Sequence, residues 1–274
     1  ESAIYAANEQ KIWRGLSARY GLRISMFNRL GSATIFDYDD NNAITDTTTY
    51  GRAENIKTYF GVEPRLSLTY AFSQSISVKA SYHRMYQYNH LLSNSTAGTP
   101  TDVWIPSSPI LKPQFSDQYS LGYFQNFFND QFEFSIEGYY KDMANVVDYE
   151  NGADLLLNAK VESQLAFGSG RSYGGELLFR RKTGKITGWV SYTLSKTEKK
   201  VAGVNNGNYY NATQDRTHDV SIVLSYKPIE RLSISANWVF YTGNAVTFPS
   251  AKYAIAGVVA PYYTERNGYR MPNY

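Results

Sequence analysis

The 274-residue sequence contains no cysteine, which excludes disulfides, thiol nucleophiles and cysteine-ligated zinc sites. It has no run approaching the roughly 18–20 apolar residues of a transmembrane helix, so a helical membrane protein is excluded as well. The formal net charge of +3 is small for this length and indicates no nucleic-acid partner. The opening residues 1–5 lack a signal-peptide pattern, and we expect them to lie inside a strand.

Aromatic residues are abundant: 25 Tyr, 14 Phe and 4 Trp make up 16% of the chain. A tyrosine-rich chain without hydropathy peaks fits two classes of protein. One is a secreted sandwich or propeller. The other is an outer-membrane barrel, whose strands give a weak hydropathy signal because only every second residue faces lipid.

Apolar and polar residues alternate with a period of two through most of the chain, which is typical of strands with one apolar face. Within 186–196, for example, Val190, Tyr192 and Leu194 alternate with serine and threonine. The predicted strands are 2–8, 16–26, 65–72, 76–83, 118–123, 132–137, 172–180, 186–196, 220–226 and 232–241. The start of one more is expected near Gly268–Tyr274.

The connections between these strands decide between the two classes. Short links near 10–15, 73–74, 129–131, 182–185 and 227–230 alternate with long ones at 31–56, 87–116, 150–170, 197–214 and 242–267. A compact soluble domain rarely has so many long irregular loops. An outer-membrane barrel has this alternation, with short periplasmic turns and long extracellular loops. We therefore predict an all-β, antiparallel transmembrane barrel; an aromatic-rich sandwich core is the alternative.

Aromatic residues also fall toward the ends of the apolar faces, where a barrel carries its girdles at the lipid–water boundary. The predicted girdle residues are Tyr20, Tyr70, Phe72, Tyr123, Phe127, Phe132, Phe134, Tyr226 and Trp238. With about ten strands and abrupt ends, the chain is expected to be one part of a larger barrel.

Three segments closely resemble the C-terminal barrel of TonB-dependent outer-membrane receptors. They are SYGGELLFRRKTGKITGWVSYTLSKTEK (172–199), DRTHDVSIVLSYKPIERLSISANWVFYTGNAVTFPS (215–250) and YYTERNGYRMPNY (262–274). The likeness is to the Bacteroidetes type that carries a carboxypeptidase-regulatory-like domain before the plug. It implies that residues 1–274 supply 10–11 strands in the C-terminal half of a 22-stranded, plugged barrel, without the plug and the first barrel half.

The same resemblance implies a receptor for active uptake of a large nutrient, such as a siderophore, oligosaccharide, peptide or cofactor, in the outer membrane of a Gram-negative bacterium. Implied partners are membrane lipid or lipopolysaccharide, the protein's own plug and a TonB-like energy transducer. For the apolar stretch Ala254–Pro261 two roles are open: a small extracellular hairpin, or contact with a surface lipoprotein lid.

Charged residues on the polar faces of the strands are expected to line the lumen and hold a plug by hydrogen bonds and ion pairs. The main candidates are Arg19, Arg23, Arg65, Glu137, Glu176 and Arg180. Further charges on these faces are Glu63, Lys79, Glu133 and Lys141. Both signs are interspersed along the sequence, which favours plug docking over an ion-selective pore.

Aromatic residues in the long loops are the candidates for ligand binding, because no lipid-facing pattern requires them there. They are Trp104, Tyr209, Tyr210, Tyr253, Tyr262 and Tyr263. Packing of one loop on another is the structural alternative for the same residues.

Residues 170–174 match the G-x-S-x-G pattern of hydrolase nucleophiles, and Asp215 and His218 follow in the order of a triad. The chemistry requires a strained strand-to-helix turn, yet Ser172 is followed by a strand-like alternation. We expect no enzyme, no cofactor and no metal site. An outer-membrane barrel enzyme using Asp215/His218 or Ser172, and a structural subunit of a surface complex, are the alternative functions.

Overall fold

The computed structural model describes residues 1–39, 43–92, 103–149, 153, 158, 160–255 and 257–274. Most of these residues are in β-strands, and two 3-10 turns occur among them, η1 (Val161–Gln164) and η2 (Asn205–Gly207). No helix among them is long and apolar enough to cross a membrane.

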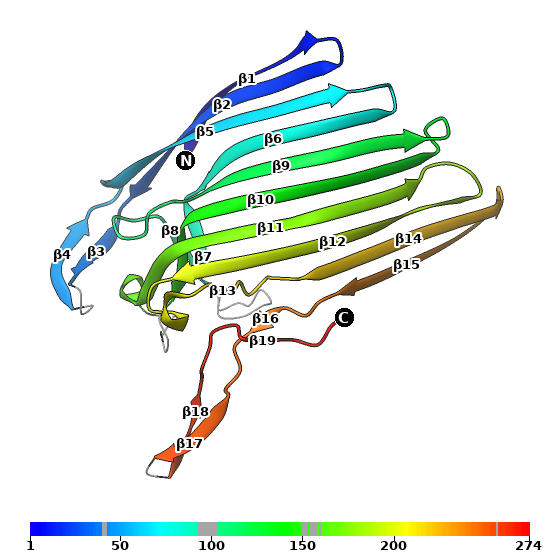
Figure 1. Ribbon diagram of the computed structural model, residues 1–274. Helices are drawn as coiled ribbons and strands as arrows, with labels where there is room; N and C mark the ends of the chain where they lie inside the picture. The colour runs from blue at the N-terminus through cyan, green and yellow to red at the C-terminus, as the bar shows by residue number, and fades with distance from the viewer. Residues whose placement is uncertain (40–42, 93–102, 150–152, 154–157, 159, 256) are drawn as a thin grey trace.

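Ten long strands form one antiparallel sheet in the order in which they occur along the chain (Figure 1). They are β1 (Ser2–Trp13), β2 (Leu16–Leu30), β5 (Asn55–Ala71), β6 (Ile76–Gln87), β9 (Gln114–Phe127), β10 (Phe132–Tyr149), β11 (Leu165–Arg181), β12 (Ile186–Val201), β14 (His218–Ile229) and β15 (Leu232–Tyr241). A short strand, β13 (Tyr210–Asn211), adds to β12. All ten predicted strands are present, and most extend further than their alternation indicated.

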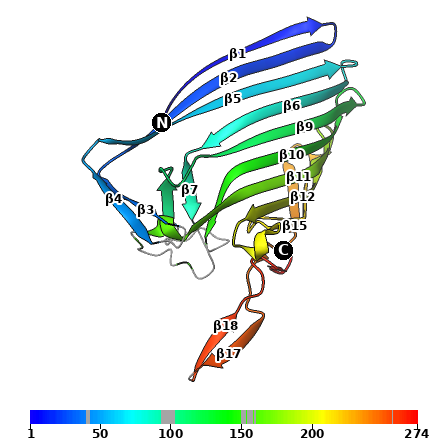
Figure 2. The same ribbon diagram turned by 60° about the vertical axis from the view of Figure 1, so that its left-hand side comes forward.

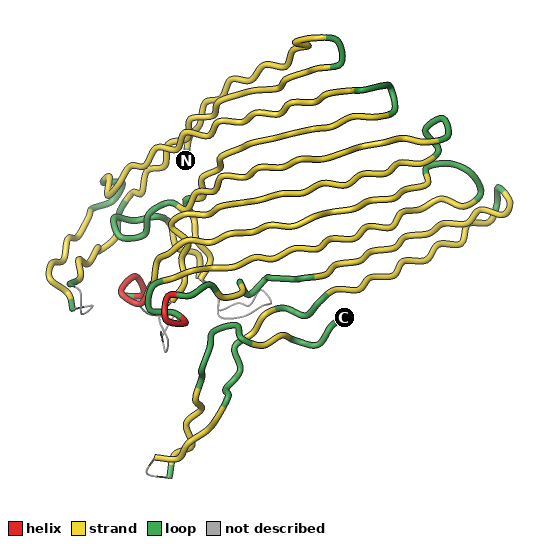
Figure 3. The backbone as a smooth tube through the Cα atoms, in the orientation of Figure 1, coloured by secondary structure: helices red, strands yellow, loops and turns green. Residues whose placement is uncertain are grey.

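The connections alternate as predicted, with tight turns at one end of the sheet and long loops at the other (Figures 1 and 3). The long loops carry hairpins of their own. These are β3 (Ala33–Tyr38) with β4 (Ile44–Tyr50), β7 (Asn89–Leu92) with β8 (Val103–Pro106), β16 (Ala245–Val246) with β19 (Tyr269–Arg270), and β17 (Ala251–Ile255) with β18 (Val258–Tyr262). The last of these projects away from the sheet (Figure 2).

The sheet curves but does not close, and β1 and β15 form its two edges (Figure 2). The partial-barrel prediction is therefore confirmed. The extra strand expected at 268–274 is only partly present, because Tyr269 and Arg270 pair with β16 rather than with the sheet. Tyr274, in contrast, exchanges two backbone hydrogen bonds of 3.0 and 3.1 Å with Tyr241 of β15.

The sheet has a split between β5 and β6 at the end that carries the long loops. These strands pair only from Arg65–Ala71 to Ser77–His83, whereas Asn55–Pro64 pairs with β2 alone. Pro64 has no N–H to give to a neighbouring strand, and it lies where the β5–β6 pairing ends.

Tyr88, which follows β6, lies over β2 and β5 in the part of the sheet where β5 and β6 are no longer paired. Its ring stacks on Phe27 with centroids 5.1 Å apart, and its hydroxyl lies 2.8 Å from Ser25 Oγ. Ser25 in turn donates to Glu63, and both are almost fully buried. A Cβ at Gly61 would lie 2.5 Å from the Tyr88 hydroxyl, so only glycine allows this close approach.

Buried side chains are concentrated at the long-loop end rather than along the sheet. One apolar cluster joins Leu92, Ile105, Leu111 and Leu165. A second joins Ala166, Val201, Val204 and Tyr210. The long loops therefore pack on one another and on the strand ends, while both faces of the sheet stay largely open to whatever surrounds and fills a barrel.

One face of the sheet carries a row of four tyrosines that the sequence alone did not reveal. Tyr82, Tyr119, Tyr140 and Tyr173 lie directly opposite one another on β6, β9, β10 and β11. Below them on β10, the apolar face ends at Phe132, eight residues away. At about 3.4 Å per residue and a tilt of about 40°, this spans roughly 20 Å, close to the apolar band of a membrane barrel.

Candidate plug-facing and ligand-binding surfaces

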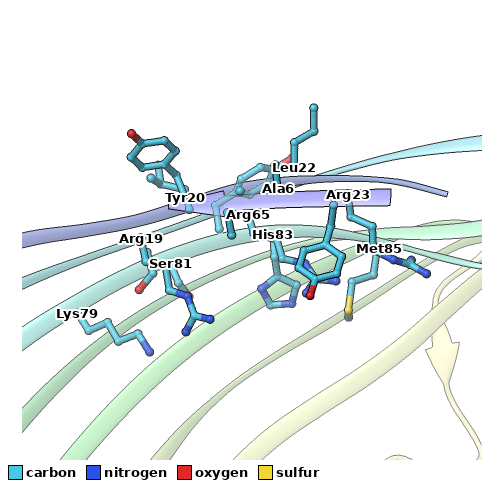
Figure 4. A pocket seen from close by; sticks show the side chains of 16 residues that line it. Ala6, Arg19, Tyr20, Leu22, Arg23, Arg65, Lys79, Ser81, His83 and Met85 are labelled. Carbon is cyan, nitrogen blue, oxygen red and sulfur yellow. The ribbon is translucent and has the colours of Figure 1, made fainter. Parts of the chain in front are cut away.

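The face opposite the tyrosine row carries the charged residues that the alternation assigned to the lumen, and we call it the lumenal face. Figure 4 shows Arg19, Lys79 and His83 on one side of the strands, with Tyr20 and Leu22 on the other. A concave pocket of about 700 Å³ lies over β2, β5 and β6, where Arg19, Arg65, Lys79 and His83 contribute to its lining.

Charges of both signs are interspersed over the lumenal face. Glu9 of β1 lies directly opposite Arg19, and Lys141 and Arg180 lie on the same strands as Glu137 and Glu176. Arg19, Arg65 and Lys79 lie on β2, β5 and β6. Glu137 and Glu176 lie directly opposite each other on β10 and β11. In the same row, Thr193 of β12 separates Glu176 from Asp219 of β14. Glu137 and Glu176 are neighbours because the register of β10 and β11 places them opposite each other.

Other predicted lumenal charges are already paired within the wall. Arg23 binds Glu63 at 2.6 Å and Glu1 at 3.0 Å. Glu133 lies opposite Arg180 and binds Lys182 of the neighbouring turn at 3.0 Å. These pairs stabilise the wall itself.

Trp104 lines a pocket of about 250 Å³ at the long-loop end. Phe36 and Tyr38 of the β3–β4 hairpin supply further aromatic surface, and Arg29 and Glu162 form an ion pair there at 3.3 Å. Arg29 also donates to the Pro106 carbonyl oxygen at 2.9 Å, which ties β8 to β2. Aromatic faces beside a charged pair suit a ligand that has both a ring and polar groups.

The other predicted ligand-binding tyrosines lie elsewhere. Tyr209 packs under the guanidinium of Arg171, 4.0 Å from its ring centroid, on the face that carries Tyr173. Tyr253 and Tyr262 lie on the projecting β17–β18 hairpin, and Tyr263 follows it; all three are exposed. The six residues therefore occupy at least three separate places rather than one site.

Tyr210 is buried, and its hydroxyl donates to Asp148 at 2.6 Å. Asp148 also binds Arg266, from the last long loop, at 2.5 Å, and Lys199 at 3.5 Å. Burial alone would raise the pKa of Asp148, but the charges of Lys199 and Arg266 and the Tyr210 hydrogen bond outweigh burial and lower it. Burial and the neighbouring carboxylate raise the pKa of Tyr210.

We call Asp148, Lys199, Tyr210 and Arg266 the rim latch, because they join the last loop to β10 and β12. Arg266 also donates to the Tyr149 carbonyl oxygen at 2.7 Å. Asn205 holds the backbone of Arg266 from both sides, accepting from its N–H and donating to its carbonyl oxygen. Sequence reasoning missed this group, since 118 positions separate Asp148 from Arg266.

The residues of the proposed hydrolase triad are bound to other partners. Ser172 Oγ lies 2.9 Å from Thr197 Oγ1, and the His218 ring lies 2.9 Å from the Tyr192 hydroxyl. Asp215 is buried against Arg270 and accepts from the Thr197 backbone N–H. Within the described part of the chain, no three His, Asp or Glu side chains are grouped to hold a metal ion.

An open, curved antiparallel wall with an apolar face, a charged lumenal face and long loops at one end is the architecture of an outer-membrane-type barrel. The family model described as "TonB dependent receptor-like, beta-barrel" matches residues 1–271. The chain belongs to this family of transport receptors, which are not enzymes. Comparison with curated protein sequences gives no match.

Solved structures of the same architecture are similar in fold at low sequence identity. The ferric-catecholate import receptor Fiu of E. coli K12 matches with a TM-score of 0.62 and 16% identity, over 89% of this chain and 34% of its own. The alcaligin outer-membrane receptor FauA of Bordetella pertussis matches with a TM-score of 0.54 and 18% identity, over 88% and 38%. The FrpB iron transporter of Neisseria meningitidis gives a TM-score of 0.57 and 12% identity, over 88% and 33%. The chain thus spans about a third of the length of these receptors.

Proposed function

We propose that residues 1–274 form part of the barrel wall of an outer-membrane importer that takes up a large nutrient with energy from a TonB-like protein. The observation that carries this proposal is the curved ten-stranded wall, which matches the receptor-barrel family over residues 1–271. The similar solved structures include a ferric-catecholate import receptor and an iron transporter. We therefore consider iron chelates the first candidates for the cargo, before oligosaccharides, peptides and cofactors.

The ligand first meets the extracellular loops. Of the predicted aromatic residues, Trp104 is best placed to bind it, because its ring is exposed within an aromatic pocket. Tyr209, Tyr253, Tyr262 and Tyr263 are exposed at other points of the loop surface and provide secondary contacts. Tyr210 we assign to the rim latch instead.

The partners follow from the exposed surfaces. The tyrosine-bordered apolar face suits outer-membrane lipid and lipopolysaccharide, and the lumenal charges suit the protein's own plug. On the projecting hairpin, Val258 and Val259 are more than 60% exposed, which favours contact with a surface lipoprotein lid. We assign the protein to the Bacteroidetes type from the sequence resemblance of residues 172–199, 215–250 and 262–274.

Replacing Trp104 by alanine in the full-length receptor is expected to weaken ligand binding about tenfold, because stacking on an aromatic face contributes on the order of 1 kcal/mol or more. Binding and uptake are measured in whole cells with a panel of labelled ferric siderophores, oligosaccharides, peptides and corrinoids. Phe60→Ala is the matched control, since Phe60 is exposed on the lipid-facing side of β5.

Uptake of the labelled compound that the receptor binds should stop when a protonophore collapses the proton gradient across the inner membrane. Binding of that compound should persist. Uptake that continues without the gradient would contradict active import. Binding that is unchanged in Trp104→Ala would contradict only the placement of the ligand site.

A further inference from the structure

The split between β5 and β6 leaves one side of β5 without a neighbouring strand. β5 pairs with β2 from Asn55 to Tyr70, whereas its pairing with β6 ends at Arg65. Beyond that point the two strands diverge toward the long loops (Figures 1 and 2). Because β5 and β6 are interior strands of the sheet, further strands added at β1 or β15 would leave the split as it is.

The hydrogen bonds at the other end of β5 show which of its residues face the split. The N–H of Ala71 donates to Gly15 on the β2 side, and the N–H of Phe72 donates to Ile76 on the β6 side. Neighbouring residues of a strand direct their backbone groups to opposite sides. Since the register with β2 is unbroken from residue 57 to residue 70, the even-numbered residues in this range face β6.

Thr58, Phe60 and Val62 therefore direct their N–H and C=O groups into the split, and we call this segment the free edge. Among the described residues, none of these backbone groups forms a hydrogen bond on that side. Pro64, the next even-numbered residue, has no N–H to donate. The donors and acceptors of the free edge extend over about 14 Å of strand.

Aromatic side chains cover the lumenal side of the split. Gly61 belongs to the lumenal face, and a Cβ there would lie 2.9 Å from Tyr86 Cδ2 and 2.5 Å from the Tyr88 hydroxyl. Tyr88 is buried and bonded to Ser25 of β2. These rings separate the free edge from the lumen, so a partner for it has to approach from the outward side of the wall.

The outward side of the free edge is open and uncharged. Phe60 is 66% exposed and Val62 is 50% exposed. Charged side chains are a common means of keeping foreign strands away from an exposed edge, and the three residues of the free edge have none.

The spacing of the backbone groups selects the chemistry of the partner. Groups of alternate residues repeat about every 7 Å along the free edge, and an extended polypeptide repeats its own N–H and C=O groups at the same interval. The acyl chain of a lipid has no donor or acceptor to offer them. An extended polypeptide satisfies the backbone and covers the apolar side chains together.

We propose that the free edge binds an extended segment of a separate polypeptide at the cell surface, which adds to the wall as one more strand. The outward side chains of this segment are apolar, because they lie beside Phe60 and Val62. This interaction is additional to nutrient import and requires neither the cargo nor the plug.

The first test uses the full-length receptor in lipid nanodiscs and a fluorescent heptapeptide in which valine and threonine alternate. Fluorescence anisotropy should show saturable binding. Phe60→Pro removes the N–H at the middle of the free edge, which the ladder to β2 does not use. We expect Phe60→Pro to bind the peptide about tenfold more weakly than Phe60→Ala, which removes the ring but keeps the N–H. Val62→Lys, which adds a charge, should also weaken binding.

Ile24→Lys is the matched control for Val62→Lys. The outward residue Ile24 lies directly opposite Val62, but it is paired with β1 on one side and β5 on the other. Its substitution should leave peptide binding unchanged. The same heptapeptide methylated at every backbone nitrogen keeps its side chains, has no N–H to donate and should not bind. Heat-modifiable migration on gels verifies that each barrel is folded.

Absence of saturable peptide binding to the wild type up to about 1 mM would overturn the proposal. Binding of the methylated peptide, or equal binding to Phe60→Pro and Phe60→Ala, would overturn it as well. None of these results would bear on active import, which is measured separately by uptake.

Hydrogen exchange in the purified full-length receptor tests whether the edge is free. The amides of Thr58, Phe60 and Val62 should exchange faster than those of Tyr59 and Gly61, which face β2. Equally slow exchange at all five would show that a segment of the receptor itself pairs with the edge, and it would overturn a separate partner.

Discussion

Replacing Arg266 by alanine is expected to release the last long loop from the rim of the barrel at a cost of roughly 3 kcal/mol, the low end for breaking a buried ion pair. Asp148 would keep a buried charge with Lys199, at 3.5 Å, as its remaining cationic partner. The backbone oxygen of Tyr149 would lose its donor as well. Hydrogen–deuterium exchange in the full-length receptor should rise in the β17–β18 hairpin and in the residues that follow it.

Two further variants make this result specific. Asp148→Asn should have a similar effect, because it leaves the Arg266 guanidinium buried without a carboxylate. Arg231→Ala, in an exposed short turn, removes the same side chain where the structure shows no ion pair and should leave exchange unchanged. Exchange in the last loop that is equal in wild type and Arg266→Ala would show that the rim latch does not hold it.

Replacing Ile222 by arginine is expected to destabilise the barrel by about 2–4 kcal/mol, the cost of a cation near the bilayer midplane. Ile222 lies opposite Val190 and Trp238 on the apolar face, and it is four residues from each of His218 and Tyr226. Leu194→Arg on β12 should act in the same direction and by a smaller amount, because Leu194 lies opposite His218, nearer the rim.

Ser221→Arg is the matched control, since Ser221 is the immediate neighbour of Ile222 and belongs to the lumenal face. Urea unfolding of the receptor in lipid vesicles measures all three variants. Equal losses for Ile222→Arg and Ser221→Arg would mean that the two faces of β14 do not differ in environment.

The strands and their lipid-facing side were predictable because both follow from local patterns. A strand that crosses a bilayer needs an apolar residue at every second position, and the short and long connections then identify the two ends of the barrel. Val190, Tyr192 and Leu194 show this directly: their alternation alone placed them on the apolar face. The tyrosine row could not be predicted, since it depends on the register of four strands.

The rim latch was unpredictable for a more specific reason. Asn145 has a φ of 55° and forms a bulge in β10, where the register shifts between Ala144 and Val146. A single extra residue turns every following side chain to the opposite face of the sheet. Strict alternation along β10 would place Asp148 on the apolar face. The bulge instead turns it to the lumenal side, where it contacts Lys199, Tyr210 and Arg266. No local pattern marks Asn145 as a bulge.

The pairing of Glu137 with Glu176 could not be predicted for the same kind of reason. Along the sequence, Arg65 and Lys79 are followed by Glu137 and Glu176, and 39 positions separate the two carboxylates. In the sheet, the two cations lie on neighbouring strands and the two carboxylates lie opposite each other. In a barrel, the pairing of strands determines which residues lie next to each other. That pairing depends on the position of each turn and bulge.

Single-cysteine labelling along β14 tests most directly whether this wall stands between lipid and a lumen. The described chain has no cysteine of its own, so residues 220–225 can be replaced one at a time. Spin labels at 220, 222 and 224 should be accessible to oxygen dissolved in lipid, and labels at 221, 223 and 225 should be protected from it. Uniform protection at all six positions would indicate a buried sandwich core, and it would contradict a membrane-spanning barrel wall.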